Sequence, residues 1–124
     1  MNKATFAFDE RLDTDFLEEL FEGDKEHATM VFEQFLSGIQ VHLKEVDENF
    51  STGNVESFRQ KVHKIKPVFS FVGLTSLTRE AELIEDQCKQ NCGFAELENS
   101  YKDFKNNITE FIPVIENELL KLKE

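Results

Sequence analysis

The stretch from Ser57 to Arg79 holds the residues best suited to chemistry. It contains five Lys and Arg residues and no Asp or Glu, and His63 lies within it. A neutral imidazole beside an ammonium group can attack phosphorus as a nucleophile, while the ammonium stabilises the oxygens of the transferred group. Lys66 follows His63 by three residues and is the candidate for that second role.

Helical geometry predicts that the His63 side chain points to solvent. Val62 and Ile65 belong to the apolar face of the expected helix, and His63 lies about 100° and about 160° around the axis from them. Three polar side chains share its face, at spacings of four, three and seven residues: Arg59, Lys66 and Ser70. The alternative interpretation is a solvated helix face on which the histidine has no role, and spacing and charge alone favour that alternative.

The elements that must position this stretch are predicted to be helical. Only two Pro and five Gly occur in 124 residues, and apolar side chains recur at steps of three and four. The pattern predicts helices over about 13–22, 25–50, 55–72, 75–90 and 94–122. Gly73 should end the third helix, and Thr75 or Ser76 should cap the fourth.

Four long amphipathic helices with short loops predict an antiparallel up-and-down four-helix bundle. The short extra helix at the N-terminus is expected to cover one end of the bundle. The length suits one all-α domain over residues 1–124.

Charge and hydropathy exclude several classes of partner. Fourteen Lys and Arg against 25 Asp and Glu give a net charge of −11, which repels nucleic acid and anionic lipid. No apolar run reaches the ~20 residues of a membrane span, and residues 1–5 do not resemble a secretory signal. We therefore expect a cytoplasmic protein that contacts neither membranes nor nucleic acid.

The remaining candidate ligands give little support for a metal site. Cys88 and Cys92 have no second pair of cysteines and are expected to be free thiols. His27, His42 and His63 lack the Glu-x-x-His pattern of di-iron bundles. A metal-binding bundle is kept only as an alternative, and no cofactor is expected.

Residues 62–74 read Val-His-Lys-Ile-Lys-Pro-Val-Phe-Ser-Phe-Val-Gly-Leu. This segment resembles the phosphorylation segment of histidine-containing phosphotransfer (HPt) domains. Four positions match the family's pattern: the His, an aliphatic residue and a Lys shortly after it, and a Gly ten positions after it. They are His63, Ile65, Lys66 and Gly73. The order of predicted helices is also similar over the whole chain. The sequence departs from the family at Pro67, where Gly is usual, and at Phe69 and Phe71, where small residues are common.

The resemblance implies that His63 is the phosphoacceptor, that Lys66 steadies the phosphoryl group and that Gly73 ends the helix. It also implies response-regulator receiver domains and a hybrid sensor histidine kinase as partners, with Mg²⁺ belonging to the receiver. No Gly-rich phosphate loop is present, so a monomeric carrier is expected rather than a kinase.

Receiver docking is expected on the face around His63, with five residues as candidate contacts: Arg59, Lys64, Pro67, Ser70 and Phe71. Phe71 could instead pack against the first helix, and both interpretations stay open. The main alternative for the whole chain is a helical protein-interaction module without phosphoryl chemistry, in which replacing His63 changes nothing.

Overall fold

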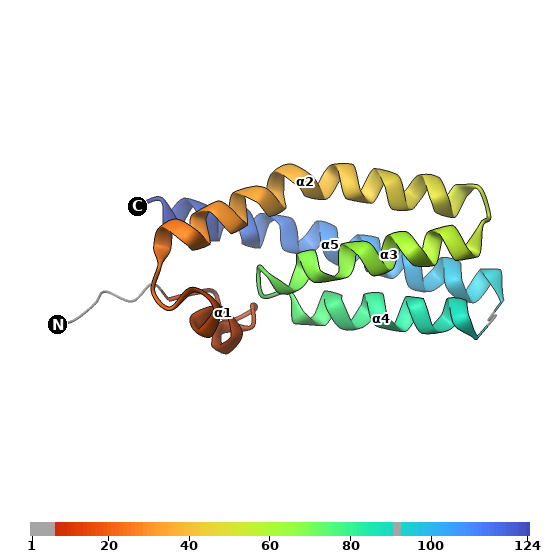
Figure 1. Ribbon diagram of the computed structural model, residues 1–124, viewed down its shortest axis with the longest axis horizontal. Helices are drawn as coiled ribbons and strands as arrows, with labels where there is room; N and C mark the ends of the chain where they lie inside the picture. The colour runs from red at the N-terminus through yellow and green to blue at the C-terminus, as the bar shows by residue number, and fades with distance from the viewer. Residues whose placement is uncertain (1–6, 91–92) are drawn as a thin grey trace.

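The computed structural model describes residues 7–90 and 93–124, which form five helices and contain no strand. In chain order these are α1 (Thr14–Phe21), α2 (Lys25–Ser51), α3 (Val55–Ser70), α4 (Thr75–Lys89) and α5 (Phe94–Leu122) (Figure 1). The predicted all-helical class is confirmed. No helix in the described part of the chain is both long and apolar enough to cross a membrane.

Helices α2 to α5 pack in a closed ring. α3 contacts α2 and α4, and α5 contacts the same two helices from the other side. The short α1 lies at one end, near the turn between α3 and α4 (Figure 1). The N-terminal part of the chain therefore reaches the same turn that follows the histidine-bearing helix.

Aromatic rings fix the inner face of α3. Phe58 and Phe69 are almost fully buried and meet two rings of α5, Tyr101 and Phe104, at centroid distances of 5.0 and 5.6 Å. Such contacts stabilise a core beyond the burial of area alone. With this face held inside, the opposite face of α3 is directed to solvent.

Three large apolar residues near helix starts are more than one-third exposed: Phe16, Val55 and Phe94. Val55 and Phe94 are the first residues of α3 and α5, at the end of the bundle, where neighbouring helices cover a side chain incompletely. Phe94 nevertheless stacks on Phe50 with ring centroids 5.1 Å apart.

The helix starts show which caps operate. Asp24 and Asn54 each accept a hydrogen bond from the backbone N–H three residues later, at 3.0 Å. The expectation that Thr75 or Ser76 caps α4 is wrong, because Leu74 occupies the N-cap position and no side chain caps it. The Thr75 hydroxyl instead donates to Asp13 Oδ2 at 2.9 Å, so it joins α4 to the start of α1.

The turn after α3 requires a glycine. α3 ends at Ser70, two residues before the predicted end, and Gly73 follows with a φ of 77°. The Gly73 carbonyl accepts a hydrogen bond from the Asp13 N–H at 2.8 Å. A Cβ on Gly73 would lie 2.7 Å from Leu17 Cδ1, so α1 and the turn touch without room for a side chain.

We expect Gly73→Ala to lower the free energy of unfolding by about 2–5 kcal/mol, because a left-handed backbone strains alanine and the methyl group collides with Leu17. Gly53→Ala is the matched control, since its φ is 75° but no atom lies within 4 Å of the added carbon. That control should lose only about 1–2 kcal/mol in urea unfolding. Equal losses for the two variants would contradict the packing of α1 against this turn.

Candidate functional site

His63 lies on the outer face of α3. Its neighbours Val62 and Ile65 are fully buried, whereas the His63 side chain is 65% exposed. A helix packed against its neighbours in a bundle holds the imidazole more firmly than a loop would. The ring is therefore presented to solvent from a rigid support.

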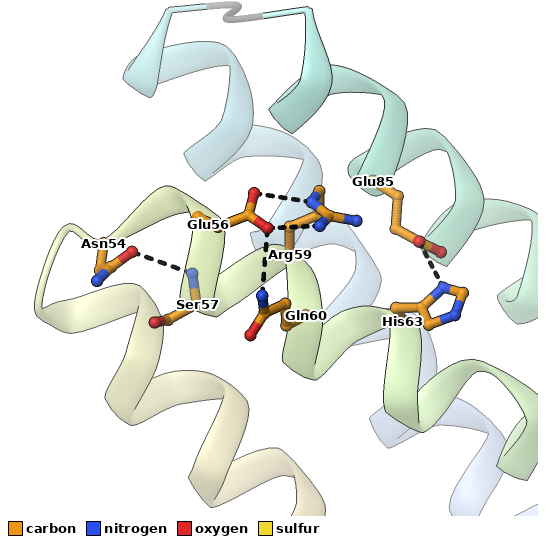
Figure 2. A network of polar contacts seen from close by, with 7 residues as sticks. All are labelled: Asn54, Glu56, Ser57, Arg59, Gln60, His63 and Glu85. Carbon is orange, nitrogen blue, oxygen red and sulfur yellow. Dashed lines mark hydrogen bonds and ion pairs between the residues drawn. The ribbon is translucent and has the colours of Figure 1, made fainter.

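A buried carboxylate on α4 fixes the orientation of the imidazole. His63 Nδ1 lies 2.8 Å from Oε1 of Glu85, which is only 5% exposed (Figure 2). We assign the proton to Nδ1 because an ionised carboxylate can only accept a hydrogen bond. In the neutral ring, Nε2 then keeps its lone pair, and it is the nitrogen available to an electrophile.

Lys66 is bound to the same carboxylate. Its Nζ lies 2.9 Å from Glu85 Oε2 and 3.9 Å from Glu82 Oε2. The acid-free stretch of sequence is therefore not an isolated basic surface, because α4 places two acids against its central lysine. His63, Lys66 and Glu85 form one connected group, here called the His–Glu–Lys cluster.

Opposing effects set the charge of Glu85. Burial acts to raise its pKa, but the ion pair with Lys66 and the hydrogen bond from His63 outweigh burial, so the pKa of Glu85 is lowered. Glu85 thus stays ionised in the pH range in which an imidazole is neutral. It can orient the ring and compensate positive charge that develops on it.

The lowered pKa of Glu85 implies that the free energy of unfolding depends on pH. The Glu85 contribution is fully present above the ordinary carboxyl value of about 4.5 and is lost as the pH falls through the lower folded value. The difference in unfolding free energy between the wild type and Glu85→Gln should therefore shrink between pH 6 and pH 3. Urea unfolding at several pH values measures it. A difference that grows toward acid would contradict the ionised cluster.

The candidate docking residues differ in their exposure and in whether another side chain of this protein already binds them. The Arg59 guanidinium donates to Glu56, with Nε 3.0 Å from Oε1, and is engaged within α3 (Figure 2). Ser70 Oγ lies 3.0 Å from Thr78 Oγ1 of α4. Lys64 is exposed. Whether any of these residues contacts a partner stays a prediction.

Pro67 and Phe71 occupy the last turn of α3 and its C-cap. Pro67 is exposed and lies inside the helix, and its carbonyl accepts from the Phe71 N–H at 3.3 Å. Proline has no N–H, so it cannot supply the helical hydrogen bond to the His63 carbonyl. Phe71 is 50% exposed and lines a cavity of about 200 Å³ that it shares with residues of α2, His42 among them.

The other histidines lie elsewhere. The His27 ring meets Phe21 edge-on, with centroids 5.1 Å apart. Within residues 7–90 and 93–124, no group of three or more His, Cys, Asp or Glu side chains could hold a metal ion. Cys88 is buried, and Cys92 lies outside the described residues.

The sequence interpretation assigned no role in the site to Glu85, the acid of the cluster, or to Glu82 beside it. Glu85 lies four residues after Ala81 and three before Cys88, so it occupies a buried position on the apolar stripe of α4. An acid at such a position needs a partner. That spacing was the available signal, and it pointed toward a cation or a histidine on a neighbouring helix.

The sequence of this chain is similar to a known phosphorelay protein and to one protein family. The chain is 25% identical over 105 residues to the phosphorelay intermediate protein rdeA of Dictyostelium discoideum. That match covers 85% of this chain but only 41% of the relative, so the chain spans about two-fifths of its length. No solved structure gives a significant match. The family model described as the Hpt domain matches residues 30–122, well over half of the sequence, and the chain therefore belongs to the Hpt domain family of phosphotransfer carriers.

Proposed function

We propose that this chain is a phosphorelay intermediate in which His63 accepts a phosphoryl group on Nε2 and exchanges it with the aspartate of a receiver domain. The observation that carries the proposal is the exposed imidazole whose Nδ1 is held 2.8 Å from a buried carboxylate. Such a ring offers one oriented nucleophilic nitrogen without a general base, because Nε2 already carries its lone pair.

In the proposed step, the phosphoryl group moves from the receiver's aspartate to the imidazole. The Nε2 lone pair forms the bond to phosphorus while the bond from phosphorus to the aspartyl oxygen breaks, and the receiver recovers its carboxylate. Positive charge develops on the ring, and the Glu85 carboxylate at Nδ1 compensates it. Lys66 would turn from Glu85 toward the phosphoryl oxygens. The divalent cation that assists this step belongs to the receiver.

We take α2 to α5 as an antiparallel up-and-down four-helix bundle in one domain, with α1 covering one end. The carrier would act as a cytoplasmic monomer between a hybrid sensor kinase and a receiver domain, without ATP-binding machinery of its own. The relative's role as a phosphorelay intermediate supports this assignment.

Receiver docking over the last turn of α3 gives a separate prediction. Pro67→Lys should slow transfer at least tenfold at low receiver concentration, because a long charged side chain would stand beside His63. Pro67→Gly is the matched control and should stay within about threefold. Initial rates over a series of receiver concentrations distinguish a docking effect from a chemical one. Full activity of Pro67→Lys would move the docking surface away from this turn.

The test of the proposed function is incubation of the full chain with a receiver domain phosphorylated on its aspartate. We expect phosphate to appear on this chain in a form that acid hydrolyses and base does not, as a phosphorus–nitrogen bond requires. If no phosphate moves in either direction with several receivers, the chain is better described as an interaction module.

A further inference from the structure

Lys66 is shared by two carboxylates of different character. Glu85 lies at 2.9 Å, is buried and also holds His63. Glu82 lies at 3.9 Å, one turn earlier on α4, and its side chain is 56% exposed. One ammonium thus faces two negative charges before any phosphoryl group arrives.

The two acids cannot respond equally to phosphorylation. A phosphoryl group on Nε2 brings about −1.5 to −2 charges at pH 7. Glu85 is fixed by burial and by its bond to the imidazole. Glu82 is exposed and bound to no other group that the described residues supply. It is therefore the acid that competes with the phosphoryl oxygens for Lys66 from an adjustable position.

We infer that Glu82 is a positioning residue that opposes phosphorylation of His63 by competing for Lys66, and so favours release of the phosphoryl group to a receiver. This inference rests on the proposed function. Glu82 would make the chain hold its phosphoryl group less strongly, although Glu82 does not contact the reacting nitrogen.

Among the ion pairs of the described residues, Lys66 is the cation that Glu82 contacts. On α3, Arg59 is paired with Glu56. Lys61 and Lys64 are the other cations of that helix beside the cluster, and neither shares the Glu82 carboxylate among the ion pairs of the described residues. An effect of Glu82 that passes through Lys66 must therefore vanish when Lys66 is removed.

The test uses phosphoramidate, a small donor that needs no partner. Its phosphorus–nitrogen bond breaks, a bond from phosphorus to the imidazole nitrogen forms, and ammonia leaves. Mass spectrometry gives labelling of His63 relative to His27, an exposed histidine near the start of α2 that serves as an internal reference. Glu82→Gln should raise this ratio about two- to fivefold, the size expected for one exposed charge pair.

Two further variants make the result decisive. Glu110→Gln removes the same charge from an exposed position on α5, a helix that carries no member of the His–Glu–Lys cluster, and should leave the ratio unchanged. In a Lys66→Ala background, Glu82→Gln should have no effect, since their interaction energy is lost. Unfolding in urea checks that all variants fold.

A second arm separates this inference from the proposed function. At equilibrium with a phosphorylated receiver, Glu82→Gln should keep about two- to fivefold more phosphate on this chain. Equal ratios for Glu82→Gln and Glu110→Gln, or a Glu82 effect that persists without Lys66, would overturn the inference. Absence of phosphate from His63 in every protein and in both arms would instead overturn the proposed function.

Discussion

Replacing His63 with Gln is expected to abolish phosphoryl acceptance from a phosphorylated receiver domain. Glutamine has no nucleophilic nitrogen, so no phosphorus–nitrogen bond can form. Its side-chain amide can still donate toward Glu85, which limits the cost of leaving a buried carboxylate without its partner. The fold should persist because the His63 side chain is 65% exposed and lies outside the core.

The matched controls for this variant are His27→Gln and His42→Gln. Both should accept phosphate at the wild-type rate, because His27 packs on Phe21 and His42 lines a cavity between α2 and α3. Circular dichroism and urea unfolding show whether each variant folds. Unchanged labelling of the His63 variant would remove the basis of the proposed function.

Lys66→Ala is expected to slow transfer by roughly ten- to a thousandfold, the range for loss of one electrostatic donor to a transition state. The loss should persist at saturating receiver, because the role proposed for the ammonium is to stabilise the phosphoryl oxygens and not to assist docking. At saturating receiver, where a docking contact no longer limits the rate, Lys64→Ala is the matched control, since Lys64 is exposed and lies outside the His–Glu–Lys cluster. Stopped-flow or quench kinetics provide the measurement.

Lys66 also has a structural role that the kinetics must be separated from. Its Nζ lies 2.9 Å from a buried carboxylate, so Lys66→Ala leaves Glu85 with His63 as its remaining polar partner among the described residues. Some loss of stability is therefore expected. Lys66→Arg keeps the charge and should recover part of the rate. If Lys66→Ala and Lys64→Ala gave equal rates, Lys66 would have no part in transfer.

The helices could be predicted from the sequence because their cause is local. Val62, Ile65 and Phe69 recur at steps of three and four and are all buried. The predicted end of α3 was less accurate. The turn that contains Gly73 begins two residues earlier than the apolar pattern suggests. Periodicity describes the face of a helix well and its last turn poorly.

The His–Glu–Lys cluster could not be predicted in the same way. His63 and Glu85 are 22 residues apart and lie on different helices, so their contact depends on the axial register of α3 against α4. The prediction of the α4 cap was wrong for a related reason, since the Thr75 hydroxyl donates a hydrogen bond to Asp13, which lies in a distant segment of the sequence. Contacts of this kind follow from tertiary packing, which a single sequence specifies only indirectly.

The central claim is that His63 carries the phosphoryl group on Nε2 while Glu85 holds Nδ1. Phosphorus–nitrogen coupling measured by NMR on the ¹⁵N-histidine-labelled chain after transfer from a receiver identifies the nitrogen directly. We expect coupling to Nε2 of His63 and a proton retained on Nδ1. Phosphate on Nδ1 of His63, or on another histidine, would contradict it.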